Sequence, residues 1–371
     1  MDNTKIGFFE ALCVLLIVVL SHLILILPKI IIQSQGSASI INIVYVTLLA
    51  IFTVSILNLL YKKFKGMDIL DISNFLLGKK FRFIVGIIYI IYLVFICSLL
   101  LRITAENLKT MYFQNTPTPY IVFFIVLAVG FINRYSLKSI IKCNLIIVPL
   151  IILSFIVLFA LSSGNFVFER VFPVLGYGTK NTFLVGASNI FCFSNILFLF
   201  LIMPHLKDYK QFNKLSYTAI ILSGILILSV IASLLLMFPI SISSGSSIPL
   251  YLQTRAITFG KLIQRIDAFF VLIWNLNILS YCSIVIGFIV YLFKKISNIQ
   301  STSTISYSFV AILFGASLIY NNIIQARKLE AVGYKYLVLS LVFGLGFLIL
   351  LFANIKRIVK KNNLKGEQSI E

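Results

Sequence analysis

The chain has 371 residues, of which 60% are hydrophobic and 11% charged, and its mean hydropathy is +1.06. A soluble protein of this length needs far more polar surface to cover its core, so the composition excludes a soluble globular fold. The net charge of +20 does not indicate nucleic-acid binding, because the basic residues stand in short clusters rather than in one stripe or tail. We therefore expect a single integral membrane domain, residues 1–371.

Ten apolar segments follow one another along the chain, and most are long enough to cross a bilayer. They cover approximately residues 6–32, 38–61, 83–109, 120–133, 143–162, 181–203, 216–239, 266–293, 305–323 and 335–355. Lipid offers the backbone no hydrogen-bond partner, and long apolar runs without alternation favour helices over a barrel. The sequence predicts an all-α polytopic membrane protein with about ten transmembrane helices.

The basic clusters predict the orientation of these spans. They fall at 62–82, 134–142, 207–214, 294–295 and 356–365, which lie on one side of a ten-span protein. The positive-inside rule then places both termini in the cytoplasm, with a cytoplasmic tail over 356–371. The first apolar stretch exceeds the roughly 7–15 residues of a signal-peptide core, so we expect it to be retained.

No pattern in the sequence indicates catalysis or metal binding. The five cysteines lie in or at the ends of apolar segments without a C-x-x-C pair, which is typical of small buried side chains; they are Cys13, Cys97, Cys143, Cys192 and Cys282. No nucleophile and base stand in a recognisable arrangement. We expect neither an enzyme nor a cofactor or metal site.

Ten spans divide into two sets of five, and an odd number of spans gives the halves opposite orientation. Inverted repeats over about 1–162 and 181–355 are therefore possible. In such proteins the substrate lies near the midplane, where the first helix of each half is interrupted. Span one carries Ser21 and His22 deep in its apolar run, and Pro28 would disrupt the helix near the carbonyl of Ile24.

Span six, at the matching position, has a small and polar first half from Gly186 to Asn195, followed by an apolar run. We therefore predict a ligand site between spans one and six, with polar residues orienting a small zwitterion and apolar residues forming its walls. The polar set is Ser21, His22, Ser194 and Asn195, and the apolar set is Leu23, Leu25 and Phe193. The alternative for His22 is a neutral histidine that joins neighbouring helices.

Two further pairs of residues are either structural or involved in gating. Arg102 and Glu106 stand four residues apart toward the outer end of span three, so their side chains share a face and can pair. Asp267 and Trp274 stand two helical turns apart on span eight, and Tyr281 continues their stripe. Pairing is the simpler interpretation of Arg102 and Glu106, with gating of the outer mouth second. For Asp267 we expect pairing with Arg265 or a loop cation. For the stripe of Trp274 and Tyr281 we expect packing or anchoring at the membrane interface, with a ligand cage second.

Several local motifs resemble those of the spore germination permease family, the B subunits of nutrient germinant receptors within the amino acid-polyamine-organocation superfamily. They are LLGKK at Leu76–Lys80, R-x-x-A-E-N at Arg102–Asn107, T-P at Thr116–Pro117, FPVLGYG at Phe172–Gly178 and QRIDAFFVLIW at Gln264–Trp274. The sequence departs from the family in span one, where no glycine occurs between Gly7 and Gly36. It departs again in span six, where Ser194 and Asn195 replace an expected Gly-Glu pair.

The resemblance implies a five-plus-five inverted-repeat, LeuT-like fold in the spore inner membrane. It also implies two partners, a larger A subunit and a C-subunit lipoprotein, besides membrane lipids and a small nutrient such as an amino acid. The competing function is a secondary amino-acid transporter. We place none of the acidic residues at the midplane, which favours sodium over proton coupling for that alternative.

Overall fold

The computed structural model describes residues 5–257, 266–297, 299, 301–320 and 322–367, with the backbone alone from 360 onward. These residues are nearly all helical and contain no strand beyond an isolated bridge between Ile6 and Leu206. In that bridge the Ile6 N–H donates to the His205 carbonyl at 2.7 Å, and the Lys207 N–H donates to the Ile6 carbonyl at 2.9 Å. The N-terminal segment is thereby tied to the loop that follows span six.

The helices of the first half, in chain order, are α1 Phe8–Leu25, α2 Leu27–Gln35, α3 Ser39–Tyr61, α4 Ile69–Leu77, α5 Lys79–Met111, α6 Thr118–Ile132 and α7 Leu137–Ser162. Those of the second half are α8 Asn195–Ile202, α9 Phe212–Met237, α10 Ile240–Gly245, α11 Pro249–Ala256, α12 Ile266–Ser297, α13 Thr302–Leu318, α14 Ile323–Leu329, α15 Lys335–Leu339 and α16 Phe347–Glu367. The π-helical segments Glu330–Tyr334 and Ser340–Gly346 join α14, α15 and α16 into one span.

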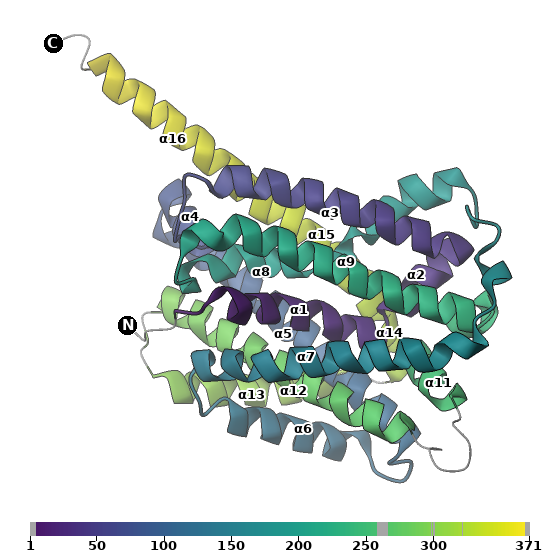
Figure 1. Ribbon diagram of the computed structural model, residues 1–371. Coiled ribbons are helices and arrows are strands. Elements are labelled where there is room, and N and C mark those ends of the chain that lie inside the picture. Colours follow the sequence, from purple (N-terminus) through teal and green to yellow (C-terminus); the bar gives the residue numbers. More distant parts are fainter. Residues whose placement is uncertain (1–4, 258–265, 298, 300, 321, 368–371) are drawn as a thin grey trace.

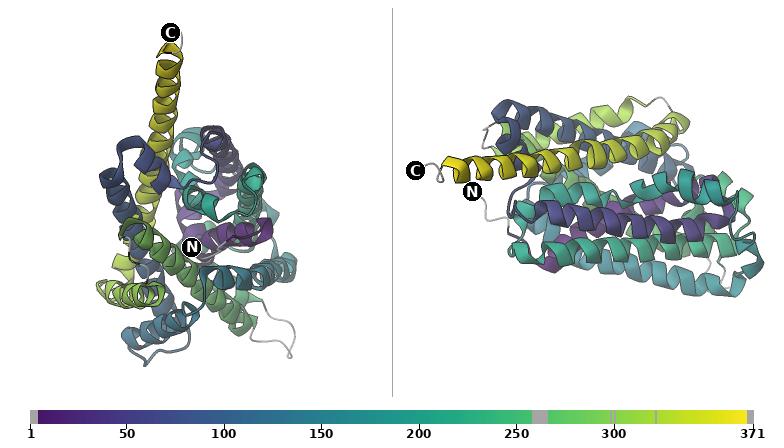
Figure 2. Two further views of the ribbon diagram at one scale, coloured as in Figure 1. Left: turned by 90° about the vertical axis from the view of Figure 1, so that its left-hand side faces the viewer. Right: turned by 90° about the horizontal axis from the view of Figure 1, so that it is seen from above.

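The ten predicted spans are all found as helices. Within the described residues, seven helical stretches are long and apolar enough to cross a membrane, and a bent pair over Asn181–His205 makes an eighth. The two remaining spans are the shorter apolar helices α6 and α13. The prediction of an all-α polytopic protein is therefore confirmed. Both chain ends leave the bundle at the same end, and α16 extends beyond it (Figures 1 and 2).

Helix α1 lies at the centre of the bundle (Figure 1). Of its apolar window, 83% is buried, against 28% for the apolar stretch Leu137–Asn165 that contains α7. Peripheral helices instead turn large apolar side chains outward, as Phe52 and Leu59 of α3 do. On a soluble protein such faces would mark interaction sites, whereas here they face lipid. Ser21 and His22 of α1 therefore lie deep inside the protein.

Span one is interrupted next to Pro28, as predicted. Helix α1 ends at Leu25, Ile26 caps it, and α2 begins at Leu27 with Pro28 in its first turn. Pro28 has no N–H to give to the carbonyl of Ile24, so the helix breaks there. Ser21 and His22 lie before this break, in the last two turns of a continuous α1.

Span six is broken at its predicted place. A π-helical turn over Asn181–Val185 and a 3-10 helix over Gly186–Phe193 precede α8, and the two arms of the span differ in direction by 44°. Gly186 lets this distorted arm pack closely on α3, since a Cβ there would lie 2.1 Å from Nδ2 of Asn42. The matched interruption of spans one and six is thus present in the structure.

The predicted start of span ten at residue 335 is wrong. The helical span begins at Ile323 and includes Glu330, which is fully buried. The polar stretch from Gln325 to Lys335 lowers the local hydropathy, so this segment was not assigned to the span. Its buried residues, among them Ala326 and Glu330, pack on other helices rather than on lipid. The predicted start at residue 335 left Glu330 outside span ten, whereas the structure includes this acidic residue in the span.

Candidate ligand-binding site

His22 meets a carboxylate inside the bundle. Its Nδ1 lies 3.3 Å from Oε1 of Glu330, and the two side chains are 1% and 0% exposed. Glu330 begins the π-helical segment of span ten. Single π-helical turns of this kind are frequently found at functional sites. An ionisable pair buried between spans one and ten is costly unless its members face each other, so each residue stabilises the other.

Aromatic rings of spans eight and ten contact this imidazole, and a ring of span six contacts the second of them. The ring of Tyr334, one turn beyond Glu330, stacks on His22 with centroids 4.2 Å apart and planes 23° apart. Tyr281 of α12 meets His22 edge-on at 5.7 Å, and Phe191 of span six meets Tyr334 edge-on at 5.7 Å. The broken arm of span six thus reaches His22 through Tyr334.

Ser21 belongs to a second contact between α1 and α12. Its hydroxyl donates to the Ile17 carbonyl at 2.8 Å and accepts from Nδ2 of Asn277 at 3.2 Å. Trp274 lies one turn before Asn277 and is 1% exposed. The predicted Trp274 and Tyr281 stripe therefore faces the interior of the bundle rather than lipid.

The two polar residues at the break of span six point to different neighbours. The Ser194 hydroxyl lies near that of Tyr334, and neither has a hydrogen-bond partner of ordinary geometry in the described part of the chain. Nδ2 of Asn195 donates to the Ser223 hydroxyl on α9 at 3.0 Å. His22 and Ser194 thus come together around Tyr334, whereas Asn195 turns toward α9. The predicted apolar walls Leu23, Leu25 and Phe193 are all buried.

Several polar atoms on spans six, eight and ten are buried without a hydrogen-bond partner among the described residues. Three of these atoms can donate a hydrogen bond: Trp274 Nε1, Ser194 Oγ and Tyr334 OH. The other three are acceptors: Glu330 Oε2, Asn277 Oδ1 and Asn195 Oδ1. Buried polar groups are normally paired, so such a concentration is unusual. The six atoms include both donors and acceptors.

Arg102 and Glu106 pair as their spacing predicted. Nη2 of Arg102 lies 2.8 Å from Oε1 of Glu106, which also accepts from the Thr118 hydroxyl of α6 at 3.1 Å. Nearby, Arg327 of α14 donates to Oδ1 of Asn107 at 2.8 Å. These bonds link spans three, four and ten.

Asp267 accepts hydrogen bonds from two tyrosines where α12 begins. The hydroxyl of Tyr112 lies 3.3 Å from Oδ2 of Asp267, and that of Tyr251 lies 3.4 Å from it. Burial, and then the carboxylate of Asp267, raises the pKa of Tyr112 to about 12, so this hydroxyl stays protonated and donates. Arg265, the partner expected for Asp267, lies outside the described residues.

Glu330 and Tyr334 are the site residues that sequence reasoning missed. A signal was present, because Glu330 is the one acidic residue between Asp267 and Glu367 and is followed at helical spacing by an aromatic residue. A window extended upstream to Ile323 would have placed both residues inside span ten.

The family model described as spore germination protein matches residues 5–327. The chain belongs to this family. Among its relatives, spore germination protein KB of Bacillus subtilis (strain 168) is 20% identical over 276 residues, which are 73% of each chain. Spore germination protein B2 of the same organism is 24% identical over 226 residues, 58% of each chain. Family and fold alike place the chain among permease-like membrane proteins.

Two solved transporter structures share the fold. Mhp1, a nucleobase-cation-symport-1 family transporter in a closed conformation with bromovinylhydantoin bound, superimposes with a TM-score of 0.69. The match covers 93% of this chain and 77% of Mhp1 at 11% identity. A substrate-bound, outward-open Na⁺-coupled sialic acid symporter gives a TM-score of 0.64, covering 92% of this chain and 80% of the symporter at 11% identity. The expected LeuT-like fold is confirmed.

Proposed function

We propose that the chain is the nutrient-sensing B-type subunit of a spore germination receptor, and that it binds a small amino-acid-type nutrient beside the break of span six. The observation that carries this proposal is the set of buried polar atoms on spans six, eight and ten that lack a hydrogen-bond partner among the described residues. These atoms lie in a permease-like fold, where interrupted helices line substrate sites.

An amino acid is the ligand chemistry that suits these atoms best. Its carboxylate needs donors, which Trp274 Nε1 and the hydroxyls of Ser194 and Tyr334 supply. Its ammonium group needs acceptors, which Glu330 Oε2 and Asn277 Oδ1 supply, and aromatic faces also attract cations. Leu23, Leu25 and Phe193 remain our proposed apolar walls, and Ser21, His22 and Asn195 our proposed polar contacts.

We propose that ligand binding is signalled through the irregular helices. The 3-10 arm of span six and the π-helical segment of span ten meet at Tyr334, and such segments often mark hinges. A ligand shifts the equilibrium only if it binds one arrangement of these arms better than another. The proposed recipients are an A subunit and a C-subunit lipoprotein in the spore inner membrane.

The alternative function is secondary transport of an amino acid, and the fold shared with two symporters favours it. Sodium was the expected coupling ion because no acidic residue was placed at the midplane. The buried pair of His22 and Glu330 weakens that preference, since carboxylate and histidine groups also carry protons through membranes.

Spores that lack this chain should stop responding to one class of nutrient, and reintroducing the gene should restore the response. Removing the cognate A subunit should abolish the same response and lower the abundance of this chain on an immunoblot. Nutrient accumulation in liposomes by the purified chain alone would instead establish the transporter.

We propose that both termini face the cytoplasm, because the basic clusters and both chain ends lie at one end of the bundle. In a cysteine-free background, Lys79→Cys should resist a membrane-impermeant thiol reagent applied from outside, whereas Ser241→Cys should be labelled. Both positions are exposed, so accessibility within the protein does not bias the comparison. Labelling of Lys79→Cys alone would reverse the orientation.

A further inference from the structure

A cavity of about 460 Å³ lies between the end of α3 and the start of α9, at the end of the bundle where both chain ends lie (Figure 1). Its volume falls within the roughly 300–1,000 Å³ typical of small-ligand sites. Three lysines line it: Lys62 and Lys65, which follow α3, and Lys210, which precedes α9. We call this cavity the lysine pocket. It lies apart from the ligand site proposed above and does not depend on that proposal.

The charge of the lysine pocket is one-sided. Its lining contains no aspartate or glutamate, and the ammonium groups of its three lysines form no ion pair within the described part of the chain. A fourth cation stands at the rim, because Nζ of Lys5 donates to the hydroxyl of the lining residue Tyr209 at 2.5 Å.

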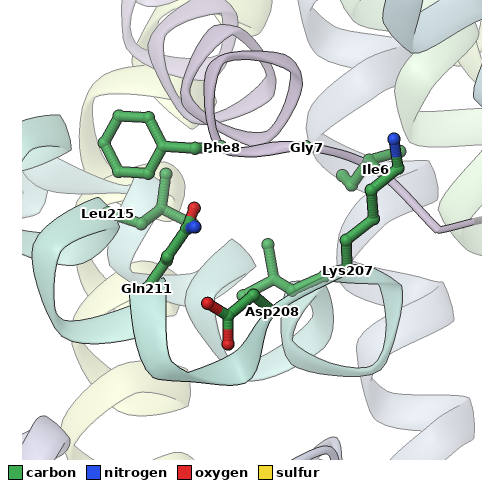
Figure 3. Close-up of a pocket in the computed structure, with 8 residues that line it drawn as sticks. Ile6, Gly7, Phe8, Lys207, Asp208, Gln211 and Leu215 are labelled. Carbon is green, nitrogen blue, oxygen red and sulfur yellow. The ribbon is translucent and has the colours of Figure 1, made fainter.

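The nearest acid along the chain, Asp208, does not line the lysine pocket. A carboxylate oxygen of Asp208 accepts from the backbone N–H of Lys210 at 2.9 Å. Figure 3 shows Asp208 lining a separate cavity of about 160 Å³ with Gln211 and the N-terminal residues Gly7 and Phe8. The two cavities thus differ in chemistry, and only the lysine pocket concentrates positive charge.

Neutral donors add to this charge. The Tyr209 hydroxyl uses its oxygen to accept from Lys5, which leaves its own proton to donate. Asn213 also lines the pocket and presents a side-chain amide. Several cations and neutral donors converging on one cavity are suited to a phosphate group, whose oxygens only accept when it is ionised.

Exposed apolar stripes lead away from the lysine pocket along both neighbouring helices. On α3, Leu59 lines the pocket and is 70% exposed, and Phe52, two helical turns earlier, is 64% exposed. On α9, Tyr217 lines the pocket, and Ile221 and Ile225 follow on the same face, 44% and 56% exposed. A free phosphate would use only the lysines, whereas a lipid would use the lysines and both stripes.

We propose that the lysine pocket binds the phosphate-bearing headgroup of an anionic phospholipid, whose acyl chains lie along the exposed faces of α3 and α9. Basic pockets between membrane helices are suited to such headgroups. The competing interpretation is three independently solvated lysines that contribute only to orientation. It predicts no selectivity for a headgroup and no particular effect of these three positions.

The test measures lipid binding to the purified full-length chain by native mass spectrometry. Dioctanoyl phosphatidylglycerol is the probe, and dioctanoyl phosphatidylcholine and sn-glycerol 3-phosphate are the comparison ligands. We expect one tightly bound phosphatidylglycerol. In the triple variant Lys62→Gln, Lys65→Gln, Lys210→Gln, the Kd for phosphatidylglycerol should rise about 100-fold. Each lysine removed weakens binding about fivefold, and the three factors multiply.

The matched control is the triple variant Lys79→Gln, Lys80→Gln, Arg82→Gln. It removes the same charge at the start of α5, outside the lysine pocket, and should keep the wild-type affinity. If both triple variants weakened phosphatidylglycerol binding equally, net charge alone would explain the effect, and the proposal would be overturned. Equal affinity for phosphatidylcholine would overturn the headgroup assignment, and equal affinity for glycerol phosphate would assign the pocket to a soluble phosphate.

Discussion

Replacing Glu330 with alanine should destabilise the protein by about 3–5 kcal/mol, because it leaves His22 without its buried partner. Glu330→Gln, which keeps the size and the hydrogen-bonding capacity of the side chain, should cost less, about 1–3 kcal/mol. Denaturant unfolding of the purified chain in detergent, followed by the fluorescence of its single tryptophan, measures both changes.

Glu169→Ala is the matched control, since Glu169 is exposed, and its effect should stay within about 0.5 kcal/mol. A double-mutant cycle with His22→Ala isolates the interaction itself. We expect a coupling energy of about 0.5–3 kcal/mol between the two positions. Additive effects of the two substitutions would show that His22 and Glu330 do not stabilise each other.

Germination by spores that carry Ser194→Ala or Asn277→Ala should need roughly 5- to 150-fold more nutrient. Each change removes one hydrogen bond to a buried ligand group, which is worth about 1–3 kcal/mol. The measurement is the nutrient dose-response of germination, with the abundance of the chain checked by immunoblot.

Ser308→Ala serves as the control, because Ser308 is exposed on α13 and donates only to the carbonyl of Thr304 in its own helix. Its curve should coincide with that of wild-type spores. Unshifted curves for both site variants at normal abundance would remove the ligand from these polar atoms on spans six, eight and ten.

The sequence was sufficient to place the spans because hydropathy reports the one property that every span shares, contact with lipid or with other apolar helices. It failed at span ten for a related reason. Glu330 and Tyr334 are buried against other spans, so the polar character of their segment reflects contacts between helices rather than exposure to water. Hydropathy cannot distinguish these two situations.

The site was predicted in part. His22 and Ser194 are polar residues within apolar spans, and the structure brings both to Tyr334. Asn195 shares this sequence signal but turns toward Ser223 of α9. The rotation of a helix about its own axis is set by packing against its neighbours, and a single sequence gives little information about it. The Arg102–Glu106 pair was predicted correctly because its geometry is local to one helix.

The central claim is that a small nutrient binds among spans one, six, eight and ten. The most direct test is the stability of the purified chain in the presence of the nutrient to which its spores respond. At 100 times its Kd, that nutrient should stabilise the wild-type chain by about 2.7 kcal/mol. At the same concentration it should stabilise Asn277→Ala by clearly less. Equal stabilisation of the two chains, or none of the wild type, would contradict the account.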